Sequence, residues 1–142
     1  MTTALLPATP NRCVIVMDKE LSGGSLANAI AVIALSVGQR HPALVGEPLV
    51  DACGFAHPGL IPTGIPMLCA PQDALASIRR EALANECDVV DFPVEGQQTK
   101  NYGEFQEMVS QVPTENIKYT GLALIGQKKT ISKIVKRLDL MS

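Results

Sequence analysis

Apolar residues along the chain fall into two kinds of segment, short continuous runs and longer stretches with helical spacing. A continuous apolar run of roughly four to eight residues is typical of a strand buried on both faces. Such runs predict four main strands, at residues 13–17, 65–70, 88–92 and 118–126, and a short one near residues 49–52. Apolar positions three or four residues apart indicate amphipathic helices. This spacing predicts four helices, at residues 22–38, 71–87, 99–112 and 130–138.

The order of these segments predicts the fold class. Strands that alternate with helices favour an α/β sandwich with a largely parallel or mixed sheet. The chain has 142 residues, the size of one ordinary domain, and it contains no internal repeat. We therefore expect one domain at residues 12–142 behind a flexible tail at residues 1–11, which has no long apolar core and does not resemble a signal peptide. Five prolines between residues 41 and 66 predict a long loop there.

The predicted helix at residues 22–38 carries apolar or small side chains on nearly every side, with Asn28 and Ser36 as its polar interior positions. A helix of this kind must be covered on more than one face. We expect the sheet to cover one side and other elements or a second subunit to cover the other, so a homodimer is the simplest assembly. Its apolar stretch is too short to cross a bilayer, and we expect no membrane partner.

Composition narrows the classes of function. The net charge of −2 argues against a general nucleic-acid-binding protein, although residues 117–138 hold six basic residues and no acid. The four cysteines, Cys13, Cys53, Cys69 and Cys87, form no close pair and have no ligand-like spacing from the two histidines. We interpret them as buried, reduced thiols of a cytoplasmic protein, and we expect neither a metal site nor a cofactor.

The segment SGGS, at residues 22–25, joins a predicted strand to a predicted helix, as many phosphate-binding loops do. It matches neither the Walker pattern GxxxxGK[ST] nor the dinucleotide pattern GxGxxG. The simpler interpretation is a tight connection with a serine as the helix cap. The alternative is that free N–H groups of the first helical turn bind a carboxylate or phosphate. The residues of this candidate site are Ser22, Gly23, Gly24, Ser25 and Asn28.

Two histidines and two aspartates are further candidates. His41 and His57 each precede a proline, which holds them extended, and each alone is best interpreted as a residue that shapes a loop. As a pair beside a pocket they would supply acid–base chemistry near neutral pH. Asp88 and Asp91 are three residues apart on a predicted strand and therefore point to opposite faces, which argues against a paired-acid mechanism. Asp91, at the end of the strand, is the better candidate.

The segment GQKKT, at residues 126–130, joins the last predicted strand to the last predicted helix. With Thr130 as the cap, Lys128 and Lys129 lie just before a helix N-terminus, where positive charge is unfavourable unless an anion is near. The simpler interpretation is that both side chains extend into water, at a cost of only about a few tenths of a kcal/mol. The alternative is an anion site, in which the lysines and free N–H groups hold a phosphate-bearing ligand or an RNA end.

Four segments together carry a resemblance to a known family. They read VIVMDKELSGGSLANAIAVIALSVGQRHP, LVGEPLVDACGFAHPGLIPTGIPMLCA, VVDFP and YTGLALIGQKKTISKIVKRL. The chain resembles the family catalogued as domain of unknown function 2000. That resemblance implies a branch of the peptidyl-tRNA hydrolase II fold, a three-layer α/β/α sandwich with a mixed sheet of about four core strands.

The resemblance does not extend to the hydrolase residues. True hydrolases of that fold open the first helix with Gly-Lys, followed by a glutamine and a histidine, and these places fall here on Gly24 or Ser25, on Asn28 and on Ala31. The family's Asp-Ala-Gly-x-Thr segment is also absent. Two hypotheses follow: a binding or regulatory protein for a small anion or nucleotide, or an ester or amide hydrolase with a rearranged site around Ser25, Asn28 and one histidine.

Overall fold

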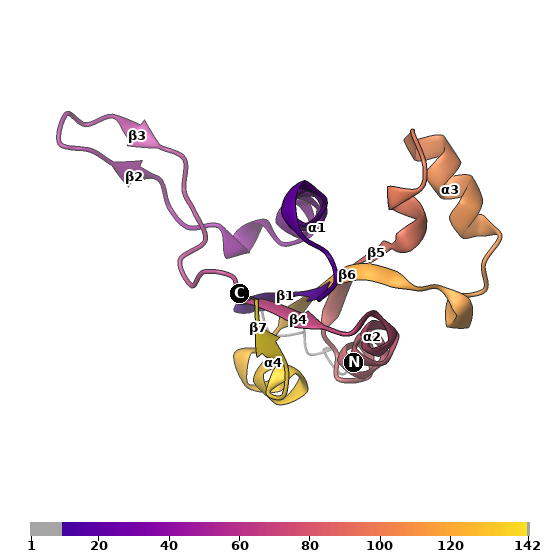
Figure 1. Ribbon diagram of the computed structural model, residues 1–142. Helices are drawn as coiled ribbons and strands as arrows, with labels where there is room; N and C mark the ends of the chain where they lie inside the picture. The colour runs from indigo at the N-terminus through magenta and orange to yellow at the C-terminus, as the bar shows by residue number, and fades with distance from the viewer. Residues whose placement is uncertain (1–9, 142) are drawn as a thin grey trace, which may run out of the picture.

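The computed structural model describes residues 10–141, which fold as an α/β sandwich (Figure 1). The strands are β1 (Arg12–Asp18), β2 (Leu49–Val50), β3 (Ala56–His57), β4 (Met67–Ala70), β5 (Asp88–Pro93), β6 (Tyr119–Gly126) and β7 (Asp139–Leu140). The α-helices are α1 (Gly23–Arg40), α2 (Gln72–Ala84), α3 (Tyr102–Ser110) and α4 (Lys128–Val135). Short 3-10 turns are η1 (Pro42–Leu44), η2 (Val94–Gln97) and η3 (Thr114–Asn116).

Five strands form one mixed sheet in the order β5-β6-β1-β4-β7. The pair β1 and β4 is parallel, whereas β6 runs antiparallel to both β1 and β5. The central strands β1 and β6 are buried almost throughout, as their continuous apolar runs predicted. The sheet has one strand more than the expected four, because the two-residue β7 is too short to produce a sequence pattern and is held by its pairing with β4.

Two apolar cores lie on the two faces of this sheet. Helices α2 and α4 cover one face, and α1 covers the other (Figure 1). The buried residues of α1 are Ala29, Ile33 and Val37, all on the side toward the sheet. On its outer side Val32 is 46% exposed and Leu35 is 79% exposed. The second cover expected for this helix is therefore not supplied by the residues that the structure describes.

Several helix boundaries differ from the prediction, because contacts other than local spacing set them. Helix α1 continues through Gly38 to Arg40, since a glycine inside a helix lowers its stability without ending it. Helix α3 begins at Tyr102, because the side chain of Asn101 accepts a hydrogen bond from the backbone N–H of Glu104 and so caps it. Tyr102, the first residue of this helix, is 73% exposed.

The end of the expected tail takes part in the fold. Residues 1–9 lie outside the described residues, but Asn11 donates its backbone N–H to the carbonyl of Gly126 (3.1 Å). The Oδ1 atom of Asn11 accepts a hydrogen bond from the N–H of Lys128 (2.9 Å). This contact caps α4, which begins at Lys128, so Thr130 is not the cap that the sequence suggested.

No helix within residues 10–141 combines the length and apolar character that a membrane crossing requires.

Candidate functional site

The glycine pair lies on the exposed first turn of α1. Ser22 has the extended backbone of an N-cap residue, but its side chain makes no capping hydrogen bond. Gly23 has a φ of +56°, a conformation that favours glycine, whereas a Cβ on Gly24 would meet open space. Ser25 and Asn28 are exposed. These glycines therefore allow the chain to turn into α1. The residues around them do not line a common pocket with the other candidate residues.

Topology separates this turn from the basic segment. Helix α1 begins beyond Asp18, at one end of β1, whereas α4 begins beyond Gly126, which pairs with Arg12 at the other end of β1. A seven-residue strand spans roughly 20 Å. The two helices also cover opposite faces of the sheet. The candidate residues at positions 22–28 and at positions 128–129 therefore cannot bind one small ligand together.

The lysines of α4 line a groove of about 590 Å³. Lys128, Lys129, Lys133 and Lys136 all contribute to it. Its other described lining residues are Asn11, Gln127 and Ser132, and none of these carries a carboxylate. Within residues 10–141 the four salt bridges use arginine or histidine as the cation and never a lysine. The lysines of this groove, here called the lysine groove, thus keep their charge available for an outside anion.

A second, more polar cavity of about 680 Å³ shares Gln127 with the lysine groove. One wall holds an ion cluster in which Asp88 accepts two hydrogen bonds from the Arg40 guanidinium, both 2.8 Å, and lies 2.6 Å from Nε2 of His41. The hydrogen bonds from Arg40, assisted by His41, lower the pKa of Asp88 to about 2. Cys87 also lines the cavity, and burial raises the pKa of its thiol, which keeps it protonated and a weak nucleophile.

The two histidines are not a catalytic pair. His41 follows α1 and contacts Asp88, whereas His57 lies in the β2–β3 hairpin with its Nε2 2.9 Å from Oδ2 of Asp51. In the hydrolase arrangement suggested by the sequence, His41 cannot be the histidine that acts with Ser25, because these two residues lie near opposite ends of α1, about 24 Å apart along its axis. Each histidine instead orders the loop in which it lies.

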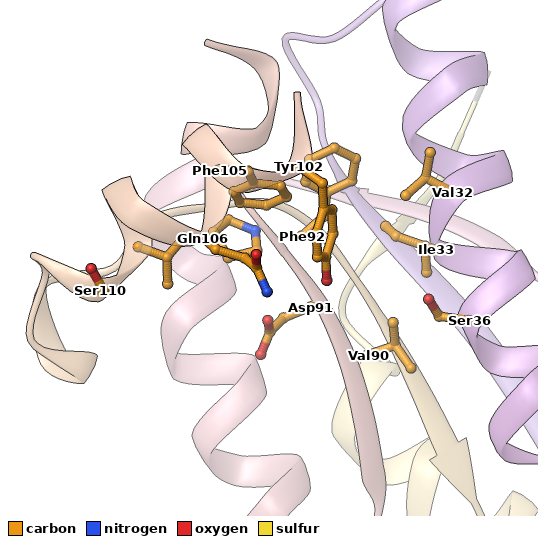
Figure 2. Close-up of a pocket in the computed structure, with 12 residues that line it drawn as sticks. Val32, Ile33, Ser36, Val90, Asp91, Phe92, Tyr102, Phe105, Gln106 and Ser110 are labelled. Atoms are coloured by element: carbon orange, nitrogen blue, oxygen red, sulfur yellow. The ribbon is translucent and has the colours of Figure 1, made fainter. Parts of the chain in front are cut away.

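Asp88 and Asp91 do point to opposite faces of β5, as their spacing predicted. Asp88 meets Arg40 on the side of α1, whereas Asp91 accepts a hydrogen bond of 2.8 Å from Nε of Arg79 on α2. Asp91 also lines a cleft of about 520 Å³ between α1, β5 and α3 (Figure 2). This cleft is mostly apolar, and the residues of α1 that line it are Val32, Ile33 and Ser36 rather than those of the glycine turn.

An aromatic wall forms one side of this cleft, hereafter the α1–α3 cleft. Phe92 and Phe105 stack with ring centroids 6.0 Å apart, and Tyr102 meets Phe105 edge-on at 6.1 Å. Behind them a Cβ on Gly96 would lie 2.3 Å from Phe92, so only glycine fits. The opposite wall is the outer side of α1, including Val32 (Figure 2).

Comparison with known proteins places the chain in a family. Residues 11–142 match the family described as Protein of unknown function (DUF2000). The chain belongs to this family. Among solved structures, a protein of unknown function, Atu0240 from Agrobacterium tumefaciens strain C58, has the same fold, with a TM-score of 0.81 and 21% identity over 92% of this chain and 97% of that chain. No curated protein matches the chain.

The candidates chosen from the sequence of this DUF2000 chain fall in three separate cavities: Lys128 and Lys129 line the lysine groove, His41 lines the polar cavity and Asp91 lines the α1–α3 cleft. Lys128 and Lys129 were found because the absence of nearby acids is visible in the sequence. Asn11 was missed because it lies 117 residues from the helix that it caps. The aromatic wall was missed because its rings come from a strand and a helix with no shared periodicity. Cys53, expected to be buried, is exposed in the hairpin. Among the described residues no cluster of potential ligands is suited to a metal ion.

Proposed function

We propose that the protein binds a small phosphate-bearing molecule, such as a nucleotide, in the lysine groove. The observation that carries the proposal is the convergence of four lysines on one groove, with no carboxylate among the lining residues that the structure describes. Phosphate oxygens accept charge-assisted hydrogen bonds from lysine ammonium groups, which are stronger than neutral ones. This is a binding or regulatory role, with the phosphate as the recognised group.

The placement of these lysines supports the proposal because it is unfavourable without an anion. Lys128 and Lys129 lie in the first turn of α4, where the helix dipole is positive. Lys129 and Lys133 are four residues apart, a like-charge spacing that costs a helix about 0.2–0.5 kcal/mol. An anion bound in the groove offsets both the unfavourable interaction of the lysines with the helix dipole and their repulsion of one another. Asn11 already occupies the N–H of Lys128, so the lysine charges supply most of the attraction.

The neighbouring polar cavity supports a ligand larger than phosphate alone. It joins the lysine groove at Gln127 and extends toward Asn85 and the His41–Asp88 pair. Amide and carboxylate groups are suited to the hydroxyl and amino groups of a sugar or base. In this proposal the phosphates occupy the lysine groove and the uncharged part of the ligand extends into this cavity.

Calorimetric titration of the full chain with pyrophosphate and with a series of nucleotides tests the proposal. We expect binding at low ionic strength that weakens with added salt. The double variant Lys128→Ala/Lys129→Ala should lose at least about tenfold in affinity, the equivalent of roughly 1.4 kcal/mol, which is near the low end of one charged hydrogen bond.

The matched control is Lys19→Ala/Lys100→Ala, which removes the same charge from two lysines that do not line the groove. This control should bind as the parent does. No binding of any probe by the parent chain, or equal losses in the two double variants, would contradict a built phosphate site. Binding of short RNA in preference to every nucleotide would assign the groove to an RNA end instead.

We also propose that the sandwich is a branch of the peptidyl-tRNA hydrolase II fold without the hydrolase activity, in the cytoplasm, where its free cysteines stay reduced. The mixed sheet and its helices are consistent with that fold. The places of the catalytic lysine, glutamine and histidine fall on an exposed stripe of α1 that holds Gly24, Asn28 and Ala31. Losing one such group commonly costs about 10²–10³ in rate. Turnover of peptidyl-tRNA at the rate of a true hydrolase would refute this assignment.

A further inference from the structure

A hairpin projects from the sandwich with little to cover it. Here called the arm, it comprises residues 46–60 and carries β2 and β3, which are only two residues long each. Every residue from 47 to 58 is exposed. In Figure 1 the arm extends from the side of α1 that faces away from α3. The arm therefore receives little support from the rest of its own chain.

Specific contacts nevertheless fix the shape of its tip. Asp51 accepts hydrogen bonds from the backbone N–H groups of Cys53 and Phe55, both 3.0 Å, and holds His57 through its other oxygen at 2.9 Å. The rings of Phe55 and His57 lie 5.2 Å apart. These contacts order the turn and hold Phe55 beside it.

Two glycines fix the base of the arm. The backbone N–H of Gly46 donates to the carbonyl of Leu60 at 2.8 Å. A Cβ on Gly59 would lie 1.9 Å from the carbonyl oxygen of Gly46, so the two backbones cross at a distance that only glycine permits. The arm therefore leaves the sandwich in a defined direction.

The arm exposes more apolar side-chain surface than is expected of a hairpin that is stable on its own. Four of its large apolar residues are more than half exposed, namely Leu49 (55%), Val50 (67%), Phe55 (66%) and Leu60 (68%). A two-stranded hairpin alone is marginally stable in water at best. An ordered arm with this surface is suited to packing against an apolar partner.

The α1–α3 cleft is an apolar surface of the matching kind. It is lined by the aromatic wall and by the outer side of α1 (Figure 2). In Figure 1 the arm and α3 lie on opposite sides of α1, so the arm points away from the cleft of its own chain. Between them α1 presents Val32 and Leu35 to solvent. The arm, the exposed side of α1 and the cleft thus each present apolar side chains that a partner can cover.

We propose that two copies of this chain form a two-fold dimer by exchanging their arms. A two-fold axis that runs parallel to α1 and brings the exposed sides of two α1 helices together places each arm on the α3 side of its partner. Phe55 then enters the partner's α1–α3 cleft, and Val32 and Leu35 pack against the partner. The large apolar residues available for this contact are between 46% and 79% exposed, namely Val32, Leu35, Leu49, Val50, Phe55 and Leu60. They contribute to the area of about 800 Å² per partner that a specific interface buries. The cleft is completed only by the second copy.

Sedimentation velocity of the full chain at micromolar concentration tests the dimer. We expect a mass of two chains for the parent and of one chain for Phe55→Glu, because a carboxylate cannot be buried in the aromatic cleft without a partner. The matched control is Leu83→Glu, a large apolar residue of α2 that is 45% exposed on the other side of the sheet. The control should remain a dimer.

Cross-linking tests the exchange itself. Cys53 is exposed in the arm, and Ser110 lines the cleft. In the Ser110→Cys variant a short bismaleimide should join Cys53 of one copy to the new thiol of the other, and a further Cys53→Ser change should abolish the covalent dimer. A parent of one-chain mass, a dimer that Phe55→Glu leaves intact, or a covalent dimer that does not need Cys53 would overturn the proposal.

Discussion

Replacing Asp88 by asparagine removes the charge that ties α1 to the edge strand β5. Asp88 accepts both hydrogen bonds of the Arg40 fork and contacts His41, so one carboxylate joins the last residue of the helix and the residue after it to the start of the strand. Asparagine has nearly the same shape, so the packing beneath it should be preserved. The perturbation therefore isolates the electrostatic part of the link.

The magnitude follows from the pKa of Asp88. Its folded-state pKa is about 2, against an ordinary value of 3.8. Without screening by water, this shift corresponds to a stabilisation of the folded state by roughly 2 kcal/mol. Arg40 is 56% exposed and Asp88 is 26% exposed, so water screens the pair and reduces this figure. We expect Asp88→Asn to lower the free energy of unfolding by about 1 kcal/mol at neutral pH.

Urea denaturation of parent and variant across pH measures this difference. Because folding lowers the pKa of Asp88, its stabilising contribution is complete above the unfolded value of 3.8 and is lost as pH falls toward about 2. The difference between parent and Asp88→Asn should therefore be present at pH 5 and above and should shrink below about pH 4.

The control is Asp139→Asn, which changes an exposed carboxylate in β7 and should alter stability by less than about 0.5 kcal/mol. If the loss of stability caused by Asp88→Asn is the same at pH 6 as it is below about pH 4, the electrostatic reasoning is refuted. It would indicate that the variant acts through packing instead.

Two further predictions concern packing and thiol reactivity. Gly96→Ala should cost about 1–3 kcal/mol in chemical denaturation, because its Cβ would lie 2.3 Å from a buried phenylalanine ring, whereas Gly24→Ala, which meets open space, should be neutral or stabilising. A Gly96→Ala variant as stable as the parent would show that the side chains of the aromatic wall move to accommodate the added methyl group at little cost in stability. Burial raises the pKa of Cys13 to about 11, so a thiol reagent near pH 8 should modify the exposed Cys53 quickly and Cys13 only after unfolding. Mass spectrometry of the partly labelled protein checks this order, and early labelling of Cys13 would contradict it.

Part of the candidate site was visible in the sequence and part was not. The acid-free stretch that contains Lys128 and Lys129 made an anion site one of two interpretations, and the structure places Lys133 and Lys136 beside them in one groove. The glycine turn suggested a separate anion site, and the fold places that turn at the other end of β1. Sequence spacing shows which residues share one element, but it does not show which ends of the sheet they reach.

The sequence by itself determined the main secondary elements and the fold class. Continuous apolar runs predicted β1 and β6, and helical spacing predicted α4, because burial on two faces or on one stripe imposes those periods locally. The alternation of these elements was sufficient to predict an α/β sandwich with a largely parallel or mixed sheet, and the sheet is mixed.

Only the tertiary structure decided what these elements place together. The cap of α4 comes from a residue 117 positions away, and the Arg40–Asp88 link spans 48. The arm, the aromatic wall and the exposed side of α1 depend in the same way on how the elements pack and on what they leave uncovered. Local sequence propensity does not predict such contacts, because residues that are far apart in the chain come within contact distance only when the chain has folded.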